Sequence, residues 1–327
     1  MKVCVVGAGA IGGFLGTRLA ATGEVSVAAL ARGATLVALR DQGWRLQTGA
    51  ALVHAPAATT SDDPSALGPQ DLVIITVKGQ ALPDLAPTLT PLIAADTLVL
   101  PAMNGVPWWF SDGSAALGER PLESVDPGGG IAAAIPSRQV IGCVVHASAA
   151  TAAPGVTLHR MGRGLIIGEP AGGASARVRA LGELLTRAGF DVTCSQRIRY
   201  DIWYKLWGNM TMNPVSALTG ATMDRVLDDA LLRAFCSRAM AEAAAIGARI
   251  GCEVRESPED RHAVTRKLGA FKSSMLQDVE ALRPLELDAL VGAVREIGQR
   301  VGVATPNCDA LFGLTRLFGR VRGLYPQ

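Results

Sequence analysis

The chain has 327 residues, 49% of them hydrophobic, which allows a large core and two domains of ordinary size. Its net charge of +2 is too balanced to indicate a nucleic-acid or anionic-membrane partner, and no long apolar run lacks a charge or a breaker, so no transmembrane helix is expected. The six cysteines and four histidines are scattered along the chain, and no two cysteines form a C-x-x-C pair. We therefore expect no disulfide framework, no metal site and a reducing cytoplasmic location.

A short apolar strand over residues 2–6 opens the chain and leads into a glycine-rich turn. A helical pattern follows to about residue 20. In a G-x-G-x-x-G turn between strand and helix, the first glycine permits the tight turn and the second lets a pyrophosphate approach the backbone. The third lets the helix pack closely on the strand, and the helix N-terminus presents N–H groups to phosphates. The expected dinucleotide-binding residues are Gly7, Ala8, Gly9, Ala10, Ile11 and Gly12.

Two other interpretations of this segment are weaker. A signal peptide would have a leucine-rich apolar region, whereas this one is punctuated by glycines. A glycine-rich turn without any ligand is the second alternative, and the position between strand and helix argues against it.

The second expected strand, residues 24–30, indicates which nucleotide binds. An NAD enzyme usually ends this strand with Asp or Glu, which holds the ribose 2′-hydroxyl. Here the strand ends in Leu30-Ala31-Arg32-Gly33, without a carboxylate and with Arg32 placed to pair with a 2′-phosphate. The pattern favours NADP(H) over NAD, although an ordinary surface arginine is the simpler alternative.

The rest of the first half alternates strands and helices. We expect a hairpin at 44–54, a strand at 71–77 of almost continuous β-branched residues, a helix to about residue 93 and a strand at 97–100. A glycine- and proline-rich loop at 111–130 precedes strands at 140–147, 155–159 and 165–168, a helix at 174–188 and a strand at 190–194. This order predicts a Rossmann-type, doubly wound α/β domain over residues 1–195.

From about residue 198 the periodicity is helical, over 202–213, 224–250, 258–267, 274–282, 284–301 and 308–317. We therefore expect a second, all-helical domain over residues 196–327, which would carry substrate-binding and catalytic residues. The active site should then lie in a cleft between the domains, at the carboxyl ends of the strands.

Polar residues at three places could carry chemistry. Thr76-Val77-Lys78 and Asn104-Gly105 each follow a buried strand, at the sheet edge where cofactors bind. Lys205, Asn209 and Asn213 follow at i, i+4 and i+8 and drift only about 80° around a helix, so they share one face. Only five of the 31 basic residues are lysines, so arginine is the usual basic residue of this chain. This argues against a purely surface role for Lys78 and Lys205. The alternative is that Lys205 extends along the surface to solvent.

These segments together resemble the ketopantoate reductase (2-dehydropantoate 2-reductase) family over nearly the whole chain. The resemblance rests on the glycine loop, the T-V-K segment, the N-G turn, the K-L-x-x-N-x-x-x-N-P helix and Ser273–Asp278 followed by Glu286-Leu287-Asp288. It implies NADPH-dependent reduction of 2-dehydropantoate (ketopantoate) to pantoate in pantothenate biosynthesis, with a small 2-oxo acid as substrate. It also suggests a homodimer through the helical domain.

The resemblance implies a role for each matching residue. Lys205 would be the general acid that protonates the carbonyl oxygen, and Glu286 would form a hydrogen bond in the substrate site. Lys78 and Asn104 would lie near the nicotinamide and the carbonyl, and Arg32 would bind the 2′-phosphate. Asn104, Lys205, Asn209, Asn213 and Ser274 would bind and position the substrate.

Two of these residues also have simpler interpretations. Pro284 resembles the first residue of a helix, which would put Glu286 in a first turn, where a carboxylate suits the helix dipole. Ser274 and Gln277 together have the pattern of a capping box.

The chain departs from the family at Met103, Met223 and Phe271, where polar residues are common, and in a longer loop around Trp108. These changes suggest more apolar pocket walls. The alternative function is therefore a reductase or dehydrogenase of the same family that acts on a bulkier or more hydrophobic 2-oxo or 2-hydroxy acid. A non-catalytic NADP(H) sensor is a third hypothesis, disfavoured because Lys205 and Glu286 are both present.

Overall fold

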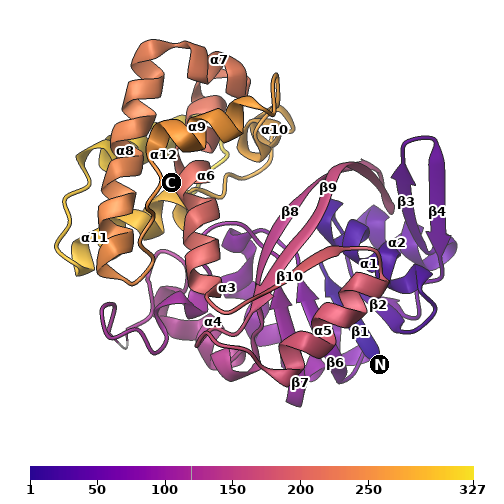
Figure 1. Ribbon diagram of the computed structural model, residues 1–327. Coiled ribbons are helices and arrows are strands. Elements are labelled where there is room, and N and C mark those ends of the chain that lie inside the picture. Colours follow the sequence, from indigo (N-terminus) through magenta and orange to yellow (C-terminus); the bar gives the residue numbers. More distant parts are fainter. Residues whose placement is uncertain (119) are drawn as a thin grey trace. The chain divides into compact units, whose positions relative to one another are not determined.

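The computed structural model describes residues 1–118 and 120–327 (Figure 1). By their contacts these residues form two compact units, Met1–Met103 with Gly129–Asp201, and Asn104–Gly128 with Ile202–Gln327. The segment Asn104–Gly128, which the sequence analysis placed in the first domain, thus clusters with the helical unit. The assignment of cofactor binding to residues 1–195 and of catalysis to residues 196–327 stays a prediction.

The first unit contains the predicted parallel sheet. Its strands are β1 (Lys2–Val6), β2 (Ser26–Leu30), β5 (Thr60–Ser61), β6 (Gln70–Ile75) and β7 (Ile93–Pro101), in the order β5-β2-β1-β6-β7. Neighbouring strands pair in parallel, with Val6 opposite both Leu30 and Ile75. The apolar runs of β1 and β6 are almost completely buried, as expected for central strands covered on both faces.

The segment between β6 and β7 is not the single helix that we expected. It consists of three short pieces, η2 (Gly79–Ala81), α3 (Leu82–Leu85) and η3 (Ala86–Leu92). Prolines at 83, 87 and 91 explain the difference, because a proline inside a helix removes a backbone hydrogen bond and clashes with the preceding turn.

A second sheet in the same unit was not anticipated as a separate layer. It contains β3 (Trp44–Thr48), β4 (Ala51–Ala55), β8 (Gly142–Ala153), β9 (Val156–Gly168) and β10 (Asp191–Ser195). The strand order is β10-β9-β3-β4, with β8 paired to β9, and Figure 1 shows β8 and β9 as a long antiparallel pair. The expected hairpin at 44–54 is confirmed as β3–β4, whereas the two strands expected at 155–159 and 165–168 are one strand, β9.

Helix α1 (Ala10–Ala21) contacts strands of both sheets. A Cβ atom on Gly13 would lie 2.0 Å from Thr157 Oγ1, and one on Gly16 would lie 2.7 Å from the Trp44 ring. Such distances are impossible for real atoms, so these two glycines let the second sheet pack directly on the helix. The glycine content of α1 thus has a packing cause in addition to its expected phosphate-binding role.

Two further helices complete this unit. Helix α2 (Gly33–Gln42) follows β2, and α5 (Ala176–Arg187) lies between β9 and β10. Ser175 caps α5 by accepting a hydrogen bond from the Val178 N–H at 3.2 Å. Glu169, at the end of β9, forms a two-point ion pair with Arg177, which holds the pKa of the Glu169 carboxyl below its usual range. The segment expected to be a loop, 111–130, contains the short helix η5 (Pro127–Gly129) near its end, and α4 (Gly130–Ala134) and η6 (Ser137–Gln139) come next.

The second unit is helical, as predicted. It contains most of α6 (Ile198–Thr219), which runs beside α8 (Ala230–Arg249) in Figure 1. The indole N–H groups of Trp203 and Trp207 donate to the α8 carbonyls of Ala243 (3.2 Å) and Met240 (2.7 Å). The remaining helices are α7 (Met223–Asp228), α9 (Pro258–Arg266), α10 (Ser274–Glu280), a π-helical turn η7 (Asp288–Gly292), α11 (Ala293–Arg300) and α12 (Pro306–Val321).

One predicted helix, at 224–250, is divided into α7 and α8. Asp229 stands between them and accepts hydrogen bonds from the N–H groups of Leu231 (3.0 Å) and Leu232 (2.9 Å), which starts a new helix. The start of the helix expected at 284–301 is also wrong, because helical structure begins only at about residue 287 and opens with the π-helical turn η7.

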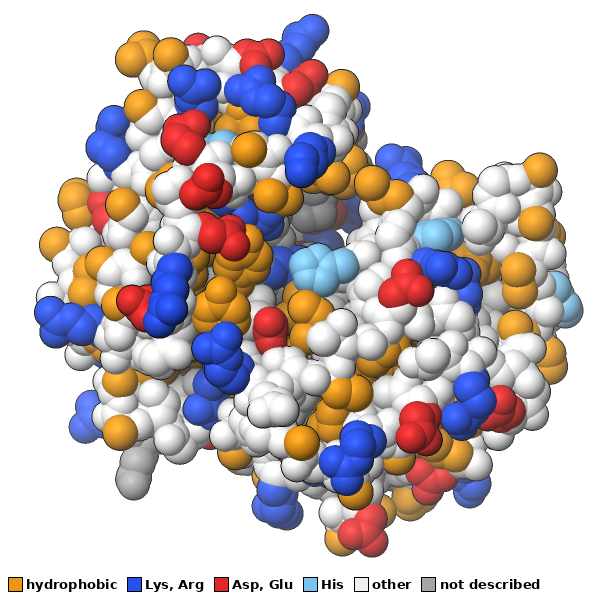
Figure 2. Space-filling view, viewed as in Figure 1, with side chains coloured by type: hydrophobic (Ala, Val, Ile, Leu, Met, Phe, Trp, Pro, Cys, Tyr) orange, Lys and Arg blue, Asp and Glu red, His pale blue; other side chains and the backbone are white. Residues whose placement is uncertain are grey.

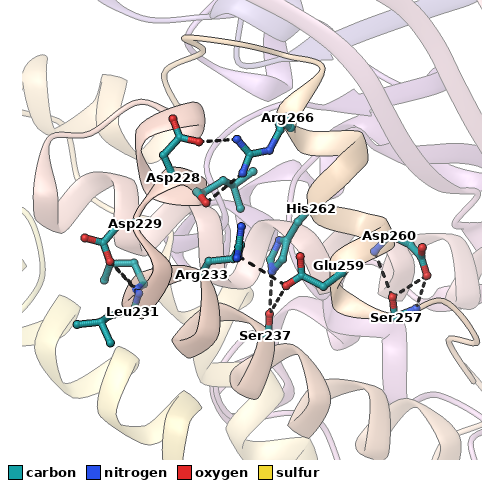
Figure 3. A network of polar contacts seen from close by, with 12 residues as sticks. Asp228, Asp229, Leu231, Arg233, Ser237, Ser257, Glu259, Asp260, His262 and Arg266 are labelled. Carbon is teal, nitrogen blue, oxygen red and sulfur yellow. Dashed lines mark hydrogen bonds and ion pairs between the residues drawn. The ribbon is translucent and has the colours of Figure 1, made fainter.

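Polar contacts join α9 to its neighbours (Figure 3). Ser257 and Asp260 form a capping box at the start of α9, and Arg266 at its end pairs with Asp228 of α7. Between them the buried His262 ring lies 3.1 Å from the Ser237 hydroxyl of α8. The contacts of Arg266 and His262 therefore set the position of α9 against α7 and α8.

The segment 104–128 packs on the helical unit through a carboxylate and an arginine. Glu296 accepts hydrogen bonds from the Ser124 N–H (2.8 Å) and hydroxyl (2.6 Å), and Arg300 donates to the carbonyls of Leu117 and Arg120. Burial alone would raise the pKa of Glu296, but these hydrogen bonds lower it below its usual range. In η4 (Trp108–Ser111) the Phe110 ring stacks on Trp203 at 6.0 Å.

The surface charges are mixed, in line with the small net charge of the chain. On the face shown in Figure 2, acidic and basic side chains are intermixed. Among the described residues, every helix is too short or too polar to traverse a lipid bilayer. Within 1–118 and 120–327, no cluster of three or more His, Cys, Asp or Glu side chains could hold a metal ion. None of the six cysteines, all of which are described, forms a disulfide, and Cys194 alone among them is exposed.

Candidate active site

The glycine loop of the first unit has the geometry that its sequence predicts. Gly7 has φ +91°, a conformation that other residues rarely adopt, and its N–H donates to the Leu30 carbonyl at 3.0 Å. A Cβ on Gly12 would lie 2.1 Å from the Gly7 carbonyl oxygen, so the helix and the loop touch there. Gly9 is exposed, and a Cβ on it would meet no atom within 4 Å. The space above Gly9 is therefore open to a ligand.

The start of α1 is suited to an anion. Gly9 is the N-cap residue and supplies no side-chain hydrogen bond to the helix, and the first turn contains no acidic residue. Ala10 and Ile11 follow in that turn, and Ala8 packs against the hydrophobic core behind the loop. Backbone N–H groups and the positive end of the helix dipole are what a pyrophosphate needs, so these residues fit the expected dinucleotide.

Thr76, for which no role was predicted, is a structural part of this loop. Its hydroxyl lies 3.1 Å from the Val6 carbonyl and is hydrogen-bonded to the Gly7 carbonyl, while its N–H donates to Val6 at 2.9 Å. The signal in the sequence is a hydroxyl directly after a buried strand. Thr76 holds the tight turn from the side of β6.

Arg32 and Lys78 stand where two strands of the parallel sheet have ended. Arg32 is exposed, follows β2 and is the N-cap residue of α2. Lys78 is partly buried, follows β6 and is the N-cap residue of η2. The residues from Ser26 to Arg32 include no carboxylate, so nothing on this strand would repel a 2′-phosphate.

The second unit brings Lys205 and Asn104 together although 101 positions separate them. The Lys205 ammonium, on α6, donates to Asn104 Oδ1 at 2.9 Å, and both side chains are partly buried. An ammonium has three N–H donors and rotates freely on a flexible stem. The bond to Asn104 gives this one a defined direction.

Asn104 is held in place by its neighbour in the turn. Gly105 has φ +85°, and a Cβ on it would lie 2.6 Å from both the Cβ and the carbonyl oxygen of Ala289. The next N–H, of Val106, donates to that same carbonyl at 2.9 Å. Ala289 belongs to the π-helical turn η7, a rare form that is frequent at functional sites.

Further along the same face of α6, the buried Asn213 donates to the Ser274 hydroxyl at 3.4 Å. The structure corrects the capping interpretation of Ser274, because Ser273 caps α10 by accepting from the Leu276 N–H at 3.0 Å. Gln277 instead donates to the Lys272 carbonyl. Ser274 is exposed, and Asn209 lies between Lys205 and Asn213, partly buried.

Glu286 is also placed differently from its simpler interpretation. It is partly buried and lies just before the helix that starts at residue 287, rather than inside a first turn begun by Pro284. The Leu285 N–H donates to the Leu324 carbonyl, which keeps this stretch extended. Glu286 thus precedes Ala289, the residue that supports the Asn104 turn, by three positions.

The apolar departures from the family have packing roles. Met223 lies in a hydrophobic cluster with Met212, Val226 and Leu311, and Phe271 packs against that cluster. The Met223 N–H donates to the Phe271 carbonyl at 3.0 Å, and Trp108 is buried. Core packing therefore accounts for Met223 and Phe271.

Comparison with known proteins covers nearly the whole chain. The family model "Ketopantoate reductase PanE/ApbA" matches residues 3–172, and its C-terminal counterpart matches residues 197–318. The 2-dehydropantoate 2-reductase of Mesorhizobium japonicum is 40% identical, covering 99% of this chain and 100% of that protein. A candidate ketopantoate reductase structure from Ralstonia solanacearum MolK2 has a TM-score of 0.95 and 57% identity, covering 99% of both chains. The 2-dehydropantoate 2-reductase structure from Methylococcus capsulatus has a TM-score of 0.84 and 26% identity, covering 98% of both.

The two loop glycines should respond differently to alanine. Gly9→Ala places a methyl group in open space, so we expect an unchanged melting temperature and weaker binding of the nicotinamide cofactor. Gly12→Ala forces a methyl group against the Gly7 carbonyl, so we expect a lower melting temperature as well as weaker binding. Thermal unfolding without nucleotide and fluorescence titration with NADPH check both. Unchanged NADPH affinity in Gly9→Ala would contradict the expectation that a dinucleotide approaches the backbone at Gly9.

Proposed function

Because the chain belongs to the ketopantoate reductase family, we propose that it reduces 2-dehydropantoate to pantoate with NADPH in pantothenate biosynthesis. The family makes it an oxidoreductase that acts on a CH–OH group with a nicotinamide cofactor. The main observation that supports this specific reaction is the Lys205–Asn104 hydrogen bond. It orients a proton donor in the unit expected to bind the substrate.

The proposed cofactor residues are the loop Gly7–Gly12, Arg32, Lys78 and Asn104. The loop N–H groups would hold the pyrophosphate, and the Arg32 guanidinium would pair with the 2′-phosphate. Lys78 and Asn104 would lie near the nicotinamide. When bound, the cofactor supplies the hydride that adds to the 2-oxo carbon.

Lys205 is the proposed general acid. The carbonyl oxygen of a 2-oxo acid gains negative charge as its carbon is reduced, and a positioned ammonium stabilises that charge most in the transition state. The oxygen takes a proton from Lys205 Nζ and becomes the hydroxyl of the product. The neutral amine that remains is reprotonated from water before the next turnover. Asn104, by accepting one N–H of the ammonium, sets the direction of the donor.

The proposed substrate-binding residues besides Asn104 and Lys205 are Asn209, Asn213 and Ser274, with Glu286 forming a further hydrogen bond. Asn213 and Ser274 support this assignment because they already contact each other, and because Ser274 does not cap its helix. The side-chain amides and hydroxyl supply donors and acceptors for the carboxylate and hydroxyl of a small 2-oxo acid.

We favour 2-dehydropantoate over a bulkier 2-oxo acid because Met223 and Phe271 pack in the hydrophobic core of the helical unit. A reducing cytoplasm is the proposed location and agrees with six cysteines that form no disulfide. A homodimer stays a prediction from the family.

The experiment that tests the proposal compares Lys205→Ala with Lys267→Ala, an exposed lysine of the same unit. Loss of a general acid typically costs about 10²- to 10⁴-fold, so we expect kcat/KM for 2-dehydropantoate to fall by that factor in Lys205→Ala only. NADPH affinity should stay within about twofold in both. Steady-state NADPH oxidation and fluorescence titration measure these values. Full activity of Lys205→Ala would exclude the proposed acid.

Arg32 is tested by cofactor preference. Removing a charge-assisted contact to the 2′-phosphate should raise KM for NADPH about tenfold or more in Arg32→Ala and leave KM for NADH unchanged. Arg40→Ala, an exposed arginine on the same helix, is the matched control and should behave as wild type. Equal effects of Arg32→Ala on the two cofactors would assign Arg32 a role unrelated to the 2′-phosphate.

A further inference from the structure

The chain's last residues fold back onto the segment that contains Glu286. Helix α12 ends at Val321, and Gly323, at φ +68°, reverses the chain. The Leu324 N–H then donates to the Gly319 carbonyl at 2.7 Å, and the Leu324 side chain is only 3% exposed. The tail is thus a packed part of the helical unit.

Tail contacts lie on both sides of Glu286. Before it, the Leu285 N–H donates to the Leu324 carbonyl at 2.9 Å, and after it the Tyr325 hydroxyl donates to Asp288 Oδ1 at 2.6 Å. A Cβ on Gly319 would lie 2.7 Å from Tyr325 Cβ and 3.3 Å from Leu285 Cδ1. The glycine therefore allows the three elements to meet. Two adjacent tail residues therefore contact residues on either side of Glu286.

The Tyr325–Asp288 contact is partly buried. Burial raises the pKa of Asp288, and the hydrogen bond from Tyr325 opposes that rise. Burial and the neighbouring carboxylate also raise the pKa of the Tyr325 hydroxyl, which keeps it protonated as the donor. Removing the donor would leave a partly buried carboxylate without this hydrogen bond, which disfavours the present arrangement.

The same segment continues to the proposed acid. Asp288 begins the turn η7, and the carbonyl of the next residue, Ala289, accepts from the Val106 N–H behind the Asn104–Gly105 turn. Asn104 in turn accepts from Lys205. Hydrogen bonds and covalent connections along the chain therefore link the tail to the segment that contains Glu286 and to the proposed general acid.

We propose that Leu324 and Tyr325 form a positioning element for the site, in which Tyr325, through Asp288, holds Glu286 in its working place. This inference rests on the proposed function, since Glu286 needs a substrate to act on. Tyr325 is a positioning residue that acts through its neighbours.

The test is a double-mutant cycle on the full-length chain with 2-dehydropantoate and NADPH. We expect Tyr325→Phe to lower kcat/KM about tenfold and Glu286→Ala about a hundredfold. NADPH affinity should stay unchanged in each. The double variant should be no worse than Glu286→Ala within about twofold, because the tyrosine acts through the glutamate. Asp288→Asn, which can still accept from Tyr325, should stay near wild type, whereas Asp288→Leu should reproduce the loss.

Gln327→Ala is the matched control in the same tail, because its side chain contacts only the Arg320 carbonyl in the contacts described for it. It should have wild-type kinetics and melting temperature. Wild-type kinetics of Tyr325→Phe, or losses that multiply in the double variant, would overturn the positioning role while leaving the proposed function intact. A wild-type protein that does not reduce 2-dehydropantoate would overturn both.

Discussion

The contact between Gly105 and Ala289 is the constraint on which the arrangement around Lys205 depends. No residue with a Cβ could take the place of Gly105, both because φ is positive and because the backbone of η7 fills that space. The turn can therefore sit directly on the Ala289 carbonyl, with Asn104 facing the Lys205 ammonium. A long, flexible lysine loses rotamer entropy when it is oriented, and the rigid turn supplies the partner that offsets this cost.

The glycine loop of the first unit likewise depends on residues without a side chain. Gly7 and Gly12 have no room for a side chain, whereas Gly9 faces open space. The first two make the turn tight and the third leaves the backbone accessible, with Thr76 bonded to the turn from the neighbouring strand. In both units a positive-φ glycine follows a strand or a turn and brings backbone groups closer than other residues allow.

Local patterns predicted much of this molecule, and long-range contacts account for what they missed. The buried β-branched run of β6 and the Gly7–Gly12 turn have periodicity and spacing that a short window contains. The second sheet has no such local pattern. Its packing on α1 depends on contacts of Thr157 with Gly13 and of Trp44 with Gly16, which are distant in the sequence. Ser273, rather than Ser274, caps α10, an error of one residue that only the hydrogen bonds resolve. The late start of the helix after Pro284 follows from a bond to Leu324, far along the chain.

The most direct measurement of the central claim is the turnover of Gly105→Ala compared with Gly113→Ala. Both glycines have positive φ, so backbone strain should cost each variant about 1–2 kcal/mol of stability, and Gly105→Ala should lose more because of its clash with Ala289. Only at Gly105 would the new methyl group meet Ala289, since at Gly113 it meets no atom within 4 Å. The account predicts that kcat for 2-dehydropantoate falls steeply in Gly105→Ala and stays near wild type in Gly113→Ala. Equal kcat values in the two variants would contradict it, because Asn104 could then move without consequence for Lys205.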